Sequence, residues 1–182
     1  MLDYIHNNPV VAGMMRFLLL ATLITSIVAC ERKTNSEKEI GSDKRVFDSV
    51  AILSVTEEKD LTNEILTFEK NVGPQIAIII VDTLNGEKVE EYSLRNAERM
   101  RLGRKEFDDG LLITLSVKDH KVRIEVGYGL EKIIKDEIAA RIIRDDMVPE
   151  FKEQKFYSGL KAALSSIRSL IEENRQLIGQ RP

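Results

Sequence analysis

The chain has 182 residues, of which 27 are Lys or Arg and 30 are Asp or Glu, so its formal charge is −3. This length predicts one folded domain, and contents of 43% hydrophobic and 31% charged residues exclude a chain that is disordered throughout. The mildly acidic balance, without a basic stripe, argues against nucleic-acid binding, which needs cationic side chains to neutralise phosphates.

Cysteine and histidine are scarce. Cys30 is the only cysteine, which excludes an intrachain disulfide and a zinc site built on paired cysteines. With His6 and His120 as the only histidines, a metal site in the folded part would consist mainly of carboxylate oxygens. Such a site would suit Ca²⁺ or Mg²⁺.

Residues 1–29 are predicted to be a signal peptide. The apolar run over residues 17–29 is shorter than the roughly 20 residues that span a bilayer, and it matches the hydrophobic region of a signal peptide. It ends in Ile27-Val28-Ala29-Cys30, which resembles the bacterial lipobox, whose cysteine is lipidated and becomes the new N-terminus. The alternative is that Cys30 is a small apolar residue near the end of a transmembrane helix.

A lipid on Cys30 would hold the folded part at a membrane, so we predict an extracytoplasmic lipoprotein, on the periplasmic face in a Gram-negative host. Residues 30–44 are polar and lack apolar periodicity, which predicts a tether ahead of a domain over residues 45–182. Because a signal peptide begins with a short basic segment, Met14 or Met15, next to Arg16, is a natural translation start.

The first half of the domain alternates helix and strand. Ser54-Val55-Thr56-Glu57 is a capping box ahead of an apolar stripe that ends at Gly73-Pro74, which predicts a helix over residues 55–71. The unbroken β-branched run over residues 75–82 predicts a central strand covered on both faces. Residues 87–101 predict a second, more charged helix.

The second half continues this alternation. Residues 111–117 predict another buried strand, and residues 118–120 a short turn into residues 121–126, where apolar and charged side chains alternate. One helix is predicted to end before Pro149 and another to close the chain, from the apolar spacing of Leu130, Ile134, Ile138 and Ile142 and of Leu160, Leu164, Ile167 and Ile171. The expected fold is a three-layer α/β/α domain around a mixed sheet of about four strands.

A set of short segments forms the most distinctive pattern of the domain. These segments are Leu102-Gly103-Arg104, Asp108-Asp109-Gly110-Leu111-Leu112-Ile113, Val122-Arg123-Ile124-Glu125-Val126-Gly127-Tyr128-Gly129-Leu130-Glu131, Asp136, Pro149, Phe151 and Gly159. The pattern resembles the TPM domain, a family named after a thylakoid-lumen phosphatase, a photosystem II accessory protein and a receptor-modulating protein. With Val46-Phe47-Asp48 and Leu53-Ser54 upstream, the resemblance extends over about residues 45–172.

Two positions depart from the family pattern. Met100 stands where the family usually has a tryptophan, and this chain contains no tryptophan. Asp109 replaces the more usual asparagine, which adds a negative charge and would alter the metal preference of a nearby site. Neither change is expected to disturb the fold.

Gly127 and Gly129 bracket the end of a strand and the start of a helix, where a positive φ or a close backbone approach favours glycine. The segment does not match a nucleotide-binding loop, because Lys132 stands where the dinucleotide fingerprint requires glycine. His120 lies in the hairpin turn, and no serine in a nucleophile-elbow pattern accompanies it, so it is predicted to be exposed and non-catalytic.

We expect four acidic side chains to meet at one edge of the sheet. Asp48 and Asp82 lie at or just beyond strand ends, and Asp108 and Asp109 enter the next strand across a loop. Because hard cations prefer clustered carboxylates, Ca²⁺ or Mg²⁺ is the candidate cofactor. The alternative is that these are solvated turn and cap residues. The resemblance supports the metal site, since family members hold divalent cations at acidic positions, and both roles stay open.

The resemblance, the lipobox and the tether together predict a non-enzymatic accessory module. Such a module would assist the assembly or maintenance of membrane-protein complexes by binding an envelope protein whose identity the sequence does not give.

The alternative is a metal-dependent phosphatase that acts on phosphomonoesters. A cation on Asp48, Asp108 and Asp109 would polarise a phosphoryl oxygen and activate water. Positive charge for the transition state would come from cationic residues nearby in the sequence, namely Arg104, Lys105 and Arg123.

Overall fold

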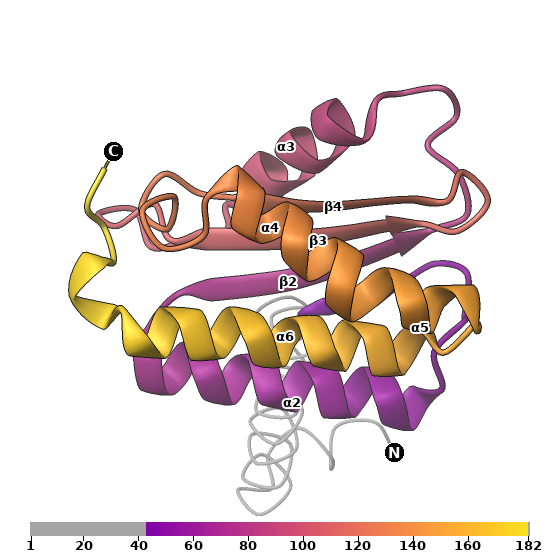
Figure 1. Ribbon diagram of the computed structural model, residues 1–182, viewed down its shortest axis with the longest axis horizontal. Helices are drawn as coiled ribbons and strands as arrows, with labels where there is room; N and C mark the ends of the chain where they lie inside the picture. The colour runs from indigo at the N-terminus through magenta and orange to yellow at the C-terminus, as the bar shows by residue number, and fades with distance from the viewer. Residues whose placement is uncertain (1–42, 182) are drawn as a thin grey trace, which may run out of the picture. The chain divides into compact units, whose positions relative to one another are not determined.

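The computed structural model describes residues 43–181, which form one α/β unit (Figure 1). Its elements are, in chain order, β1 (Val46–Asp48), α2 (Val55–Val72), β2 (Gln75–Val81), α3 (Val89–Met100), β3 (Gly110–Ser116), β4 (Lys121–Val126), α4 (Asp136–Ile142), the π-helix η1 (Ile143–Met147), α5 (Val148–Lys152), α6 (Phe156–Glu173) and the 3-10 helix η2 (Arg175–Leu177). The predicted signal peptide, Cys30 and the tether up to residue 42 lie outside the described residues. Within residues 43–181, no helix is long and apolar enough to span a membrane.

The four strands form one mixed sheet in the order β1-β2-β3-β4. β1, β2 and β3 are parallel, and β4 returns antiparallel to β3 through the hairpin turn. This confirms the predicted mixed sheet of four strands. The carboxyl ends of β1, β2 and β3 therefore lie together, at the end of the sheet that we call the crest. The amino ends of these strands lie at the opposite end of the sheet, which we call the amino edge.

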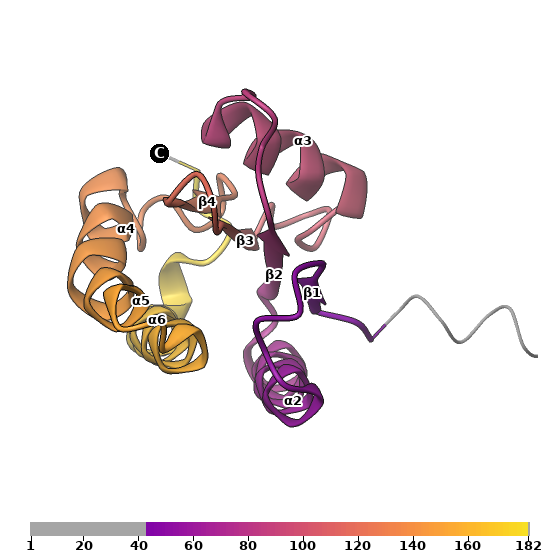
Figure 2. The same ribbon diagram turned by 90° about the vertical axis from the view of Figure 1, so that its right-hand side faces the viewer.

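Strand β2 is buried on both faces, as its apolar run predicts. Ile76, Ile78 and Ile80 belong to the larger core, and Ala77 and Ile79 belong to a smaller one on the opposite face. The larger core lies under α2, α4, α5 and α6, and α3 covers the other face, so the predicted three layers are confirmed (Figure 2).

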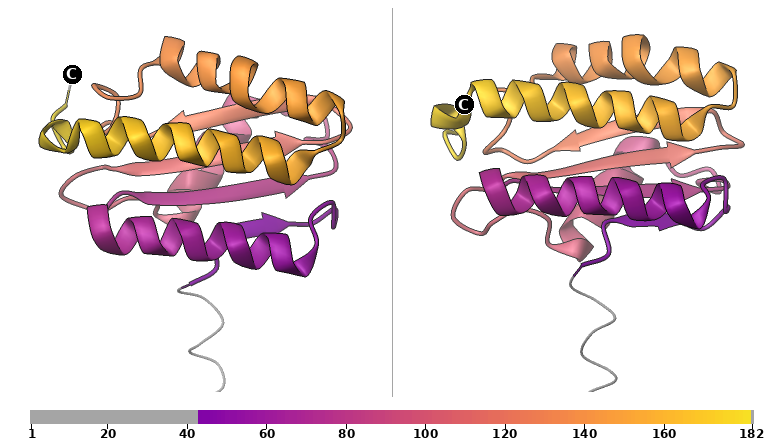
Figure 3. Two further views of the ribbon diagram at one scale, coloured as in Figure 1. Left: turned by 60° about the horizontal axis from the view of Figure 1, so that its bottom comes forward. Right: turned by 90° about the horizontal axis from the view of Figure 1, so that it is seen from below.

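Helix α2 begins where the capping box predicts. The Ser54 hydroxyl accepts from the Glu57 backbone N–H, and the Glu57 carboxylate accepts from the Ser54 backbone N–H. Helix α6 lies beside α2 (Figure 3), and ion pairs join the two helices, with Arg168 Nη1 at 2.5 Å from Glu64 Oε1. Together these two helices cover the larger core.

The prediction of one regular helix from Leu130 to the residue before Pro149 is wrong in two respects. Leu130 and Ile134 are buried in a series of turns, and α4 begins only at Asp136. The helical course also continues past Pro149, which lies in the first turn of α5, where a missing N–H costs nothing. The Val148 N–H bonds to the Ile143 carbonyl five residues back, which makes the preceding turn a π-helix.

Candidate functional site

At the crest, Asp48 holds the loop that follows β1. Its Oδ1 accepts from the backbone N–H groups of Val50 and Ala51, both at 2.9 Å, and its Oδ2 accepts from that of Leu53, also at 2.9 Å. Ala51 has a φ of 58°, so this carboxylate stabilises a loop whose backbone is strained at that residue. Asp48 thus acts as a loop cap, one of the two roles that the sequence left open.

Asp82, at the end of β2, faces the hairpin that joins β3 to β4. Its carboxylate lies 2.6 Å from the Lys118 ammonium. Next to this pair, Asp119 Oδ2 accepts from the Leu84 backbone N–H at 2.6 Å and from the Ser116 hydroxyl at 2.7 Å. These bonds fasten the loop after β2 to the hairpin. The bond from the Leu84 N–H, followed by that from Ser116, lowers the pKa of Asp119 below its usual value.

Asp108 and Asp109 lie at the opposite edge of the sheet, so the expected meeting of four carboxylates is wrong. Because β3 runs parallel to β2, the residues that enter it stand beside the start of β2, with Gly110 opposite Gln75. The seven residues of β3 separate them from the crest, which is about 20 Å at 3.3 Å per residue.

The buried carboxylate of Asp109 binds Arg104. It is fully buried, and it accepts from the Arg104 backbone N–H at 2.7 Å, from Nε at 2.8 Å and from Nη2 at 2.5 Å. The charge that Asp109 adds to the family pattern is therefore neutralised within the chain. Asp108, with a φ of 51°, pairs with Arg181 at 2.5 Å.

Because of this separation, Asp48, Asp108 and Asp109 cannot hold one cation together, as the phosphatase hypothesis requires. Asp48 lies at the crest, and Asp108 and Asp109 lie at the other edge. Of the three expected cationic groups, Arg104 binds Asp109, Arg123 lies 2.9 Å from Glu125, and Lys105 is exposed. Within the described residues, no three His, Cys, Asp or Glu side chains gather where a metal ion could be held.

The glycines of the family pattern pack loops together at the amino edge. A Cβ on Gly127 would overlap the Asp108 carbonyl, and one on Gly129 would overlap the Phe107 carbonyl. A Cβ on Gly110 would likewise overlap the Leu102 carbonyl. Of the two reasons for glycine that the sequence left open, close backbone approach applies to Gly127 and Gly129, since neither has a positive φ.

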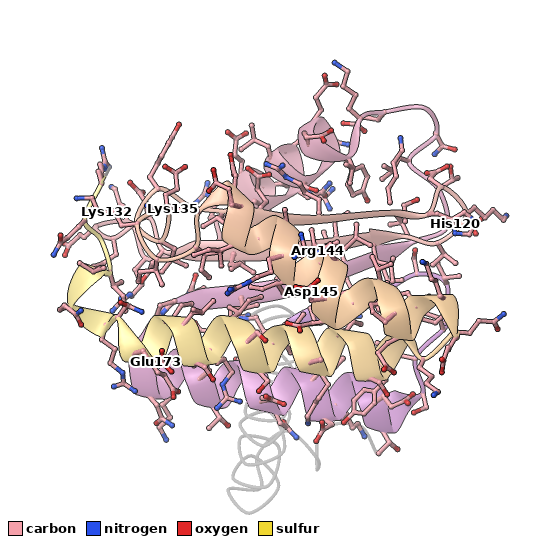
Figure 4. The ribbon with its side chains drawn as sticks, in the orientation of Figure 1. His120, Lys132, Lys135, Arg144, Asp145 and Glu173 are labelled. Carbon is pink, nitrogen blue, oxygen red and sulfur yellow. The ribbon has the colours of Figure 1, made fainter. Side chains whose placement is uncertain are left out.

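An apolar pocket of about 760 Å³ opens between the crest and the first turns of α5 and α6. It is lined by side chains from the loop after β1, the hairpin, α5 and the start of α6, namely Ile52, Leu115, Ser116, Val117, His120, Val122, Val148, Phe151, Lys152, Gln154 and Phe156. His120 is exposed at this end of the molecule (Figure 4), as its place in the turn predicts. Ligands of α/β sheets commonly bind at the carboxyl ends of the strands, so this crest pocket is the candidate site.

Two phenylalanines form the helical wall of the crest pocket. The rings of Phe151 and Phe156 have centroids 5.5 Å apart and are tilted by 43°. A Cβ on Gly159 would come within 2.6 Å of Phe151 Cε1, so glycine at this position lets the ring lie against α6. Phe151 and Gly159 were in the sequence pattern, but their role depends on a contact across the α5–α6 turn.

Replacing Asp48 with Asn is expected to lower the free energy of unfolding by about 1–3 kcal/mol, because an amide cannot accept all three backbone bonds. The loss should be the same in Ca²⁺ and in EDTA, as measured by urea denaturation. Asp82→Asn is the control, since its exposed pair with Lys118 contributes little. A loss that appears only in Ca²⁺ would show instead that Asp48 is a cation ligand.

Acid is expected to destabilise the fold partly through Asp119. Because its pKa is lower in the folded chain than in the unfolded one, its contribution is present above about pH 4 and is lost as pH falls through the folded pKa. The unfolding temperature should therefore decrease less steeply between pH 6 and pH 2 for Asp119→Asn than for the wild type. Equal slopes for the two proteins would contradict this assignment.

Several solved protein structures are similar to this fold. A domain from P. gingivalis, solved by NMR as the N-terminal domain of its protein, is 24% identical with a TM-score of 0.68, covering 74% of this chain and 86% of that one. The BA42 protein of Bizionia argentinensis is 21% identical with a TM-score of 0.59, covering 66% and 82%. The N-terminal domain of the Corynebacterium glutamicum protein cg2496 is 12% identical with a TM-score of 0.57, covering 74% and 84%.

These likenesses show a shared fold. A comparison with curated proteins gives no match. The TPM domain matches residues 46–170, which are more than half of the chain and include every strand, every helix from α2 to α5, and most of α6. The chain therefore belongs to the TPM domain family.

Proposed function

We propose that this protein is a lipid-anchored, extracytoplasmic binding module that assists the assembly or maintenance of membrane-protein complexes. Its crest pocket would receive apolar side chains of a partner protein. The observation that supports this most directly is the chemistry of the pocket, whose walls are apolar and half-buried apart from a few polar groups at the hairpin and at α5.

Such a pocket binds by removing apolar surface from water. Val117, Val148 and Phe156 are each only partly covered by the rest of the chain, so an apolar side chain that enters would bury surface of its own and of the pocket. The Ser116 hydroxyl is already bonded to Asp119. The pocket therefore offers hydrophobic contact, with His120 and Lys152 available for polar contacts near it.

The predicted lipid on Cys30 supports the same function. A domain tethered to a membrane searches for partners in that membrane at a raised effective concentration. A modest pocket can then give useful occupancy, because the anchor restricts the volume in which domain and partner move.

The phosphatase and the divalent cation have weaker support. The three carboxylates expected to hold the cation lie at two edges of the sheet, and two of them, those of Asp48 and Asp109, each accept three hydrogen bonds within the chain. A binding role needs no such cluster.

Blocking the crest pocket should weaken peptide binding. Peptides selected from a random library on the full chain in detergent are expected to be rich in apolar side chains, and Val117→Arg should weaken their binding at least about tenfold. Val55→Arg is the matched control, because Val55 is 68% exposed at the start of α2 and does not line the pocket. Equal binding to both variants, measured by fluorescence anisotropy, would refute the assignment of the pocket.

The anchor is tested separately. Cys30→Ala should abolish incorporation of labelled fatty acid and processing of the precursor by the lipoprotein signal peptidase in a bacterial host. Unchanged labelling would place the lipid elsewhere, and membrane association without any labelling would favour the transmembrane alternative.

A further inference from the structure

Strand β4 has a free edge. It is last in the sheet and pairs only with β3. The Gly127 N–H donates to the Gly110 carbonyl at 2.8 Å, and this bond fixes which residues face β3. Residue pairs along an antiparallel ladder alternate between hydrogen-bonded and non-hydrogen-bonded pairs. The backbone groups of Arg123 and Glu125 therefore bond to β3, and those of Val122, Ile124 and Val126 point outward. Within residues 43–181, these outward groups have no hydrogen-bond partner.

A groove of about 530 Å³ runs beside this edge. Its apolar part is formed by Ile124, Val126 and Ile134, and its rim carries charges of both signs, including Lys132 and Lys135. Figure 2 shows β4 at the edge of the sheet between α3 and α4, and Figure 4 shows the two lysines at the end of the molecule opposite His120. At this edge Val122 and Val126 are partly exposed and Ile124 between them is 3% exposed, and the groove beside them offers a surface that an extended chain can contact.

The charges of β4 favour one kind of neighbour. Arg123 and Glu125 lie on the same side of the strand, on either side of Ile124, and are 2.9 Å apart. An antiparallel strand with an apolar residue opposite Ile124 would place its preceding residue opposite Glu125 and its following residue opposite Arg123. A basic–apolar–acidic sequence therefore forms two cross-strand ion pairs in this register, in place of the single ion pair that joins Arg123 to Glu125 in the free chain. Arg123-Ile124-Glu125 has this order itself, so β4 is complementary to its own sequence.

We propose that the free edge of β4 receives an extended segment of the partner protein as an antiparallel fifth strand, with a basic–apolar–acidic sequence centred opposite Ile124. The main-chain bonds to Val122, Ile124 and Val126 give affinity, and the two ion pairs set the register. This inference rests on the proposed function in that it takes the partner to be a polypeptide, and the surface it concerns shares only Val122 with the crest pocket.

The probe is a labelled synthetic peptide with the sequence of residues 121–126, titrated into the full chain in detergent micelles. Binding is expected, with amide shifts at Val122, Ile124 and Val126. N-methylation of the peptide at its isoleucine should weaken binding at least about tenfold, because that N–H faces β4. N-methylation at its arginine should leave binding unchanged, because that N–H faces away. All of these measurements use the wild-type protein.

Two protein variants complete the test. Val126→Pro removes one outward N–H and leaves every β3–β4 bond in place, so it should weaken binding about tenfold, and Val126→Ala is the matched control. A peptide with its arginine and glutamate exchanged should prefer the double variant Arg123→Glu, Glu125→Arg over the wild type.

Equal binding of both N-methylated peptides, or no binding by the wild type, would overturn the inference. Dimerisation of the chain that Val126→Pro abolishes would overturn it also, by assigning the edge to a second copy. Val117→Arg should leave binding of this peptide unchanged, so the edge and the crest pocket can fail independently.

Discussion

Burial of β2 and β3 on both faces is the constraint on which the rest of this structure depends. Ile78 lies in the larger core and Ile79 in the smaller one, so helices must cover both sides of the sheet. Backbone polar groups in the two central strands are satisfied by neighbouring strands. Side chains of the sheet that bind or react can therefore stand only at the two ends of the strands or along the outer edges of the sheet.

The two ends are organised differently. At the amino edge, a buried ion pair between Arg104 and Asp109 and a group of closely packed glycines hold the loops against one another. At the crest, Asp48 and Asp119 each use a carboxylate to bind backbone N–H groups of a loop. In both places the acidic side chains are occupied in holding the fold, and the open surface left at the crest is apolar.

This arrangement explains why the sequence pattern of the TPM domain says more about structure than about chemistry. Its glycines permit backbone contact, and its Asp-Asp-Gly segment supplies the partner of Arg104. The surfaces available for recognition are the crest pocket and the free edge of β4.

The sequence by itself determined the local structure and the class of fold. The capping box at Ser54, the apolar run of β2 and the alternation in β4 depend on neighbouring residues, and each was predicted correctly. Only the tertiary structure decided where distant residues meet. The direction of β3 placed Asp109 away from Asp48, and the turn between α5 and α6 brought Phe151 and Phe156 to the crest pocket. Spacing along a chain fixes which face of an element a residue occupies, but it leaves open which end of the sheet each loop joins, because that depends on the order and direction of the paired strands.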